Sequence, residues 1–250
     1  MKKIVLIAFA LSAMLWADTP FELKEDKRIT AHMVDLSKDE LHFYLKDDNG
    51  TIFKRFENLN RYLAHKNKEL LFAMNGGMYM ENSMPLGLYV ENGKVIRKTN
   101  RVKNAYGNFY MQPNGVFFIT KKGNAYVKES RKFHFKSYVN YATQSGPMLL
   151  IDGKMHPKFR KGSINVHIRN GVGILPDGKI LFAISNELIN FYDFATFFKN
   201  NGCKNALYFD GFVSRMYLPP KYDDYSNSRF GVIIGEVGEK KRSKHAEGQE

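Results

Sequence analysis

Cysteine is almost absent from this chain, since Cys203 is the only one among 250 residues. A single thiol cannot form a disulfide within the chain, so packing of apolar side chains has to stabilise the fold. Cys203 follows Gly202, which ends an expected helix, and precedes a short apolar run. A catalytic thiol needs a base beside it, and this position favours a packed apolar side chain instead.

Long apolar runs are also missing, except at the start of the chain. Lys2 and Lys3 precede an apolar run from Ile4 to Trp16, which leads to Ala17. This is the pattern of a secretory signal peptide, and the run is shorter than the ~20 residues of a membrane-spanning helix. We expect residues 1–17 to be cleaved, giving a periplasmic or secreted protein with no stable membrane insertion. The alternative is an uncleaved membrane anchor.

The chain has no Pro/Ser-rich linker, which favours a single domain over residues 18–238. Residues 239–250 are polar, lack apolar periodicity and include the basic run Lys240–Lys244. We therefore expect a disordered basic tail after the domain.

Acidic residues are outnumbered, with 25 Asp and Glu against 38 Lys and Arg, for a net charge of +13. Such an excess suits an anionic partner: a phosphorylated or acidic glycan, a lipid headgroup surface or nucleic acid. No familiar nucleic-acid-binding module is present, and an exported protein meets little nucleic acid, so we expect a glycan and no nucleic acid. The His, Cys, Asp and Glu residues match no metal-site spacing, and the sequence requires no cofactor.

Two segments have the same order of expected elements: a helix, a buried strand, and then a polar residue followed by glycine. One apolar run, Leu70–Met74, ends at Asn75-Gly76-Gly77, and the other, Ala206–Phe209, ends at Asp210-Gly211. Expected helices precede them at residues 59–64 and 191–199, the second capped by Asn190. Such units can place Asn75 and Asp210 at neighbouring strand ends, although Asp210 can also be a simple turn residue.

The rest of the chain has the pattern of β-hairpins. Turn signals stand between apolar runs at Asn92-Gly93, Lys122-Gly123-Asn124, Asp152-Gly153 and Asp177-Gly178. Residues 32–53 suggest two more strands around the turn Asp47–Gly50. We therefore predict an α+β fold of strand-rich mixed sheets, built from β-hairpins with a few packed helices.

Five segments, in order, resemble the phosphodiester glycosidase family over roughly residues 30–236. They are Asn75-Gly76-Gly77-Met78-Tyr79, Pro113-Asn114-Gly115-Val116, Ser145-Gly146-Pro147-Met148-Leu149, Arg169 with Gly171-Val172-Gly173, and Leu207-Tyr208-Phe209-Asp210-Gly211. The family includes N-acetylglucosamine-1-phosphodiester α-N-acetylglucosaminidase, and its bacterial members are often labelled exopolysaccharide biosynthesis proteins. Where the family often has Asp-Gly-Gly before the last serine, this chain has Phe212 in place of the second glycine.

The resemblance implies hydrolysis of a sugar-1-phosphodiester at the anomeric C–O bond. It implies Asp210 as base or nucleophile, with Glu187 as a second carboxylate. Arg169 and Arg215 are the expected cations for the phosphate. The other expected substrate-binding residues are polar or glycine residues of the motifs: Asn75, Gly76, Gly77, Asn114, Ser145, Gly146, Gly211 and Ser214.

Several of these residues have a second interpretation. Asn165, His167 and Arg169 alternate on one strand face, which is either a site or a solvated surface. His167 is a candidate acid, a candidate metal ligand or an ordinary hydrogen-bonding histidine. Glu187 also suits the start of a helix. At the level of the whole protein, the rival hypothesis is a non-catalytic envelope protein that binds an anionic polysaccharide during its assembly or export.

Overall fold

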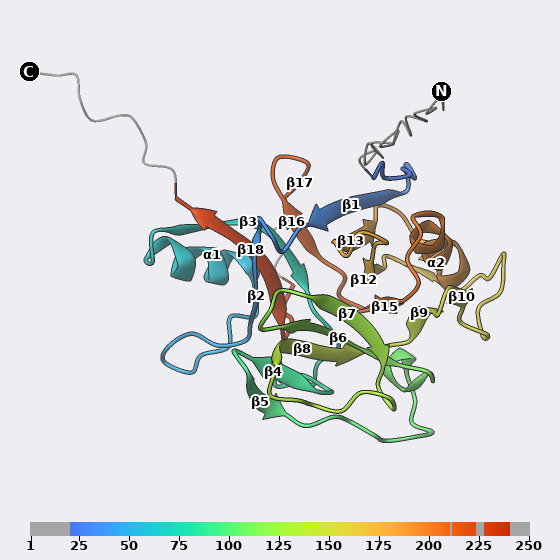
Figure 1. The fold of residues 1–250 in the computed structure, drawn as a ribbon, viewed down its shortest axis with the longest axis horizontal. Coiled ribbons are helices and arrows are strands. Elements are labelled where there is room, and N and C mark those ends of the chain that lie inside the picture. Colours follow the sequence, from blue (N-terminus) through green and yellow to red (C-terminus); the bar gives the residue numbers. More distant parts are fainter. Residues whose placement is uncertain (1–20, 211, 224–227, 241–250) are drawn as a thin grey trace, which may run out of the picture.

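The computed structural model describes residues 21–210, 212–223 and 228–240 (Figure 1). The expected signal peptide lies outside the described residues, and so does the chain beyond residue 240. Strand β18 (Ile233–Glu239) extends past the expected domain boundary, and Lys240 N–H donates to Asn67 O at 3.0 Å. Any tail therefore begins after Lys240. Among the described helices, none combines the length and apolar character needed to cross a membrane.

Three sheets and a two-stranded ribbon form the fold. The six-stranded sheet has the order β1 (Ile29–Val34), β13 (Ile180–Ser185), β12 (Asn170–Ile174), β15 (Ala206–Tyr208), β9 (Met148–Ile151) and β10 (Lys154–Met155). The β3 sheet has the order β17 (Tyr222–Asp223), β16 (Met216–Leu218), β3 (Lys68–Asn75), β18 and β2 (Glu40–Tyr44). The β8 sheet has the order β5 (Lys94–Arg97), β4 (Tyr89–Glu91), β8 (Val139–Ser145), β6 (Gly115–Thr120) and β7 (Ala125–Glu129). The ribbon pairs β11 (Val166–His167) with β14 (Ile189–Asn190).

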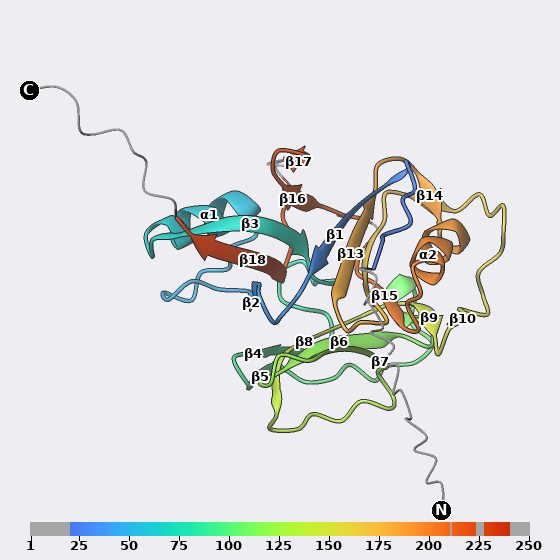
Figure 2. The ribbon, with the colours of Figure 1, turned by 45° about the horizontal axis from the view of Figure 1, so that its top comes forward.

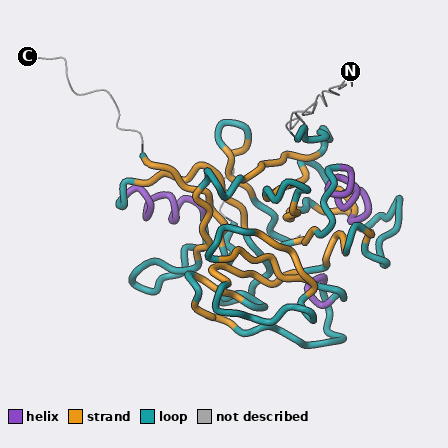
Figure 3. The backbone as a smooth tube through the Cα atoms, in the orientation of Figure 1, coloured by secondary structure: helices purple, strands orange, loops and turns teal. Residues whose placement is uncertain are grey.

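The strand-rich α+β class is confirmed, and Figure 3 shows far more strand than helix. Every strand pair in the described ranges is antiparallel, so the sheets are not the mixed ones that we expected. The hairpin turns form where Asn-Gly and Asp-Gly predicted them. Asn92 and Gly93 have φ angles of +50° and +75°, the left-handed conformations that a two-residue hairpin turn requires.

The strands expected around Asp47–Gly50 are placed differently. β1 and β2 both precede that turn, and they belong to two different sheets. After the turn only an isolated bridge between Lys46 and Ile52 forms, because Asp47 accepts bonds from the backbone of its own loop. The predicted turn at Asp47–Gly50 is confirmed, and the prediction of a strand after it is wrong.

Two α-helices cover outer faces of the sheets. Helix α1 (Phe56–Ala64) packs Leu59 and Leu63 against the β3 sheet. Helix α2 (Phe191–Asn200) lies against the six-stranded sheet, and the Asn190 side chain caps it by accepting from Asp193 N–H at 2.9 Å. A short 3-10 helix, η1 (Asn108–Tyr110), lies between β5 and β6.

The central core lies where the three sheets meet. It contains Phe72 of β3, Phe117 of β6 and Phe182 of β13, and Phe72 and Phe117 both pack their rings against Phe182. Figure 2 shows the β8 sheet as a layer below the other two sheets. Cys203 is buried in the second cluster beside α2, where burial raises the pKa of its thiol to about 12. It therefore packs as an apolar residue and stays protonated at neutral pH.

Candidate active site

Asn170, the first residue of β12, joins strands from two sheets. Its buried side chain donates from Nδ2 to Asn75 Oδ1 at 2.8 Å and to Asn75 O at 3.1 Å. Its Oδ1 accepts from the backbone N–H of Asp210 at 3.0 Å and from Ser214 Oγ at 3.3 Å. Asn75 is the last residue of β3, and Asp210 lies two residues beyond β15 of another sheet, so Asn170 bridges two expected site residues that share no strand pairing.

Asn75 is fully buried, and its amide bonds fix the chain beyond Asp210. Its Nδ2 donates to Val213 O at 2.6 Å, and its Oδ1 accepts from Arg215 N–H at 2.8 Å. These bonds use both ends of the amide, so Asn75 orders residues 213–215 and does not turn its side chain to solvent. The residue acts on the site through the segment that it holds.

Asp210 lies two residues beyond the end of β15, and neighbouring residues hold its backbone on both sides. Ser145, the last residue of β8, donates from Oγ to Phe209 O at 2.6 Å. The Ser214 hydroxyl lies within hydrogen-bond distance of Asp210 O, Ile168 O and Asn170 Oδ1, and its single proton is donated to one of these oxygens at a time. Phe212 N–H donates to Asp210 Oδ1 at 3.0 Å. Asp210 as a whole residue is 6% exposed, and its backbone is fixed by residues from two sheets.

Tyr79 lies in the electrostatic range of both the Asp210 carboxylate and the Arg215 guanidinium. The pKa of the Tyr79 phenol is raised to about 12, chiefly by burial and also by the negative charge of Asp210, while the positive charge of Arg215 opposes the rise. Tyr79 Oη donates to Arg229 O at 2.6 Å. Arg215 is half-buried, and it donates from Nη1 to Ser214 O at 2.8 Å and from Nε to Ser228 Oγ at 3.1 Å. One carboxylate and one guanidinium therefore share this neighbourhood.

Arg169 precedes Asn170, and its guanidinium packs on the α2 side of the sheet. It is completely buried, lies 3.6 Å above the centroid of the Phe191 ring, and donates to Ile189 O, Tyr208 Oη and both oxygens of Asn165. Burial lowers the pKa of this guanidinium. No carboxylate among the described residues pairs with it.

The expected role of Arg169 as a direct phosphate clamp has no support in this geometry. Four of the five N–H donors of a guanidinium are used by the protein, and no atom of the residue reaches solvent. Arg169 instead ties the loop before β11 to the start of β14, beside the strand that carries Asn170. Asn165 does contact Arg169, as the alternating pattern suggested.

We expect Arg169→Lys to lower the free energy of unfolding by about 2 kcal/mol and to leave KM for the substrate within about twofold of wild type. Lysine has three donors on one atom and cannot reproduce the fork that joins Asn165 to Ile189. Thermal denaturation and steady-state kinetics on one preparation check this. A large rise in KM with unchanged Tm would instead indicate direct contact with the phosphate.

Two glycines of the motifs are needed for close packing. Gly76 donates its N–H to Val232 O at 2.8 Å, so this N–H is not available to a ligand, and a Cβ there would lie 2.8 Å from the Ile234 side chain. A Cβ on Gly146 would lie 2.5 Å from Asn114 Cβ. Gly77 has a φ of +143°, which favours glycine, and Gly211 lies outside the described residues.

Three other expected residues take no part in the hydrogen bonds of Asn170. Asn114 is buried and donates from Nδ2 to Phe109 O, so its side chain fixes the chain before β6. Glu187 is exposed in the bend between β13 and β14, where Arg28 is its charged neighbour, so it does not begin α2 as the alternative suggested. His167 is exposed on β11. In the ranges that the structure describes, no group of three or more His, Cys, Asp or Glu side chains is arranged to hold a metal ion.

The phosphodiester glycosidase family model matches residues 68–233, more than half of the chain, and this match spans Asn75, Ser145, Asn170 and Asp210. The chain belongs to the phosphodiester glycosidase family. This confirms the resemblance that the motifs indicated.

Relatives of this chain are similar to it over most of their own length. An uncharacterized Escherichia coli K12 protein, YigE, is 35% identical over 193 residues, 76% of this chain and 74% of YigE. The zebrafish N-acetylglucosamine-1-phosphodiester α-N-acetylglucosaminidase catalytic domain, auto-inhibited by its pro-peptide, is similar with a TM-score of 0.53 and 16% identity, over 83% of this chain and 87% of that one. A putative exported protein of Burkholderia pseudomallei has a TM-score of 0.51 and 10% identity, covering 83% and 73%. These structural likenesses show a shared fold.

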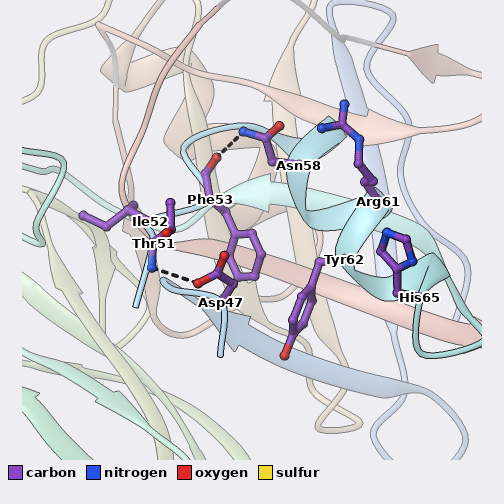
Figure 4. Close-up of a pocket in the computed structure, with 8 residues that line it drawn as sticks. All are labelled: Asp47, Thr51, Ile52, Phe53, Asn58, Arg61, Tyr62 and His65. Atoms are coloured by element: carbon purple, nitrogen blue, oxygen red, sulfur yellow. Dashed lines mark hydrogen bonds between the residues drawn. The ribbon is translucent and has the colours of Figure 1, made fainter. Parts of the chain in front are cut away.

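One hollow of this phosphodiester glycosidase family member lies away from the expected site residues. It has a volume of about 290 Å³ beside α1, and Asp47, Asn58 and Tyr62 are among its lining (Figure 4). Asp47 accepts from Thr51 N–H and Asn58 donates to Phe53 O, so these polar groups satisfy the loop itself. None of the residues expected at the active site lines this hollow.

Sequence reasoning missed Asn170, although it stands between Arg169 and Gly171 in a motif of the family. The site residue predicted from this motif was instead Arg169, the charged neighbour of Asn170. A polar residue at the start of an apolar strand was the available signal, since a buried amide needs several partners.

Proposed function

We propose that this protein is an exported hydrolase that cleaves the glycosidic bond of a sugar-1-phosphodiester in an envelope or extracellular glycan. In this reaction water adds to the anomeric carbon, the bond between that carbon and the phosphate oxygen breaks, and the bonding electrons stay on the oxygen. The products are a free sugar and a phosphomonoester. The water oxygen ends on the sugar, and its two protons are shared between the products.

The observation that supports this proposal best is the fixed Asp210 carboxylate at the junction of the sheets. Its backbone is held by Asn170, Ser145 through Phe209, and Ser214, so the side chain is oriented before any substrate arrives. Pre-organisation of this kind lets a carboxylate act as a base on water, or as a nucleophile at the anomeric carbon. Asp210 is the residue to which we assign this role.

Arg215 is the cation that we assign to the phosphate. Asn75 fixes its backbone, and its guanidinium and the Asp210 carboxylate both act on the pKa of Tyr79. A phosphodiester oxygen that leaves with an extra negative charge is stabilised by a nearby guanidinium. Glu187 stays a hypothesis as the second carboxylate, because two carboxylates are usual in glycosidases.

The deciding experiment is incubation of purified protein with a panel of sugar-1-phosphodiesters, while free sugar release is followed. We expect release from at least one substrate, with the phosphate recovered as a monoester. Running the reaction in ¹⁸O-labelled water distinguishes cleavage at the sugar from cleavage at phosphorus, since our proposal places the label on the sugar. No release from any substrate, together with tight binding of anionic glycan, would favour the non-catalytic binding protein.

Export is a separate proposal with its own test. We expect the mature chain to begin near Asp18, because Lys2, Lys3 and the apolar run ending at Ala17 form a signal peptide pattern. Intact-mass measurement of protein recovered from the periplasm or medium should show the loss of residues 1–17. Recovery from the membrane fraction with Met1 still present would contradict the proposal.

A further inference from the structure

The outer face of the β8 sheet carries a groove with a volume of about 630 Å³, which we call the tyrosine groove. It is lined by residues of β6, β7 and the adjoining loops, among them Phe118, Thr120, Lys122, Tyr126, Lys128 and Tyr138, and by Asn205 from the segment before β15. The neighbours of Tyr126 along β7, Ala125 and Val127, pack into the central core. Because side chains alternate along a strand, Tyr126 and Lys128 face away from that core. None of the residues expected at the active site lines the groove.

The strand register holds the Tyr126 ring in one orientation. Phe118 of β6 is the direct cross-strand partner of Tyr126, and the two rings stack with centroids 5.2 Å apart and planes 25° apart. Phe118 is itself 6% exposed, whereas Tyr126 is 47% exposed and Tyr138 is 54% exposed. A tyrosine ring with a buried ring beneath it presents a ready flat surface at little entropic cost.

The charge around the tyrosine groove has one sign. Lys122 and Lys128 are its charged lining residues, no carboxylate lines it, and neither lysine forms an ion pair with any described residue. Residues 121–138 hold six Lys and Arg and a single acidic residue, Glu129, which pairs with Lys132 at 3.3 Å. A groove with exposed rings and cations that lack anionic partners is suited to a ligand with both apolar ring faces and negative charges.

We propose that the tyrosine groove is an accessory binding site for an anionic oligosaccharide. The Tyr126 and Tyr138 rings pack against the C–H faces of sugar rings, and Lys122 and Lys128 meet carboxylate or phosphate groups on those sugars. A duplex nucleic acid fits poorly, because it presents phosphates outside and stacks its bases inside. The identity of this glycan rests on the proposed function, whereas binding in the groove does not depend on hydrolysis.

The test measures binding by isothermal titration calorimetry on the full mature chain. The probes are an oligogalacturonate, a phosphorylated maltooligosaccharide and a neutral maltooligosaccharide of equal length. We expect the two anionic probes to bind more tightly than the neutral one, and the stronger of the two identifies the anionic group. Tyr126→Ala should weaken binding by about tenfold and Tyr126→Phe should preserve it, because the ring face makes the contact. The double variant Lys122→Gln/Lys128→Gln should weaken binding by about fivefold per lysine and reduce its salt dependence.

Matched control variants distinguish binding in the groove from nonspecific binding by charged or aromatic side chains elsewhere on the surface. Tyr106 is fully exposed outside the groove, and Lys94 is exposed on β5, so Tyr106→Ala and Lys94→Gln should bind as wild type does. Turnover of a small sugar-1-phosphodiester should be unchanged in all groove variants. The proposal is overturned if Tyr126→Ala binds like wild type, if Lys94→Gln loses as much as the groove lysines do, or if the neutral probe binds equally well. Absence of turnover in wild type would count against the hydrolase and leave this binding test intact.

Discussion

Asp210→Asn is expected to lower kcat by about 10² to 10⁴-fold while the fold is retained. Asparagine has the same shape as aspartate, and its Oδ1 can still accept the Phe212 N–H that Asp210 Oδ1 accepts at 3.0 Å. It cannot take a proton from water or attack a sugar. The loss should therefore appear in kcat, with little change in Tm or in the affinity for a non-hydrolysable substrate analogue.

The chain offers a close control for this substitution. Asp177 also precedes a glycine, and its Oδ1 accepts from the N–H two residues later, Lys179, at 3.1 Å. If both aspartates were only turn residues, Asp210→Asn and Asp177→Asn would each cost about 1 kcal/mol of stability and neither would change kcat. Normal turnover by Asp210→Asn with a lowered Tm would end the catalytic assignment.

The sequence predicted local structure well because local structure depends on residues that are close together along the chain. Asn190 marked the start of α2, and Asn92-Gly93 marked a hairpin turn through the left-handed φ angles that those residues accept. The apolar runs ending at Asn75 and Asp210 were also found as strands. These signals need no knowledge of which sheet a strand joins.

Sheet membership was the part that the sequence could not provide. β1 and β2 are consecutive, yet β1 pairs with β13 and β2 pairs with β18. The side chains of β2 alternate between buried and more exposed, but such a pattern specifies which face of the strand is buried and not which strand lies beside it. Asn75 and Asp210 were expected at neighbouring strand ends because each follows an expected helix and an apolar run. In the structure Asn170 bonds to both residues across two sheets, and Asn75 and Asp210 do not lie on paired strands.

The contacts of the Arg169 side chain likewise could not be predicted from the sequence. A charged residue in a family motif suggested a ligand contact, because most arginines are exposed and available. The fold instead buries it under Phe191 and satisfies its donors with carbonyl, amide and phenol oxygens. Those acceptors come from residues 4, 20 and 39 positions away along the chain, so only the folded structure brings them together.

Asn170→Ala should lower the free energy of unfolding by roughly 3 kcal/mol, which corresponds to a fall in Tm of roughly 6 to 12 °C. The substitution leaves the buried N–H of Asp210 without its acceptor and removes both donors to Asn75. Because Asp210 then loses one of its backbone anchors, kcat should also fall, by about tenfold or more. Thermal denaturation and sugar release on the same preparation measure both effects.

Asn170→Asp distinguishes positioning from packing, since it keeps the shape and the acceptor oxygens. It loses the two donors to Asn75 and adds a buried negative charge beside Asp210, so both stability and kcat should fall even though no cavity forms. Asn200→Ala, at the exposed end of α2, serves as the control and should behave as wild type. An Asn170→Ala protein with normal Tm and normal kcat would show that the Asn170 bonds do not hold Asp210 in place. A normal kcat with a lowered Tm would limit Asn170 to joining the sheets, with Asp210 held well enough by Ser145 and Ser214.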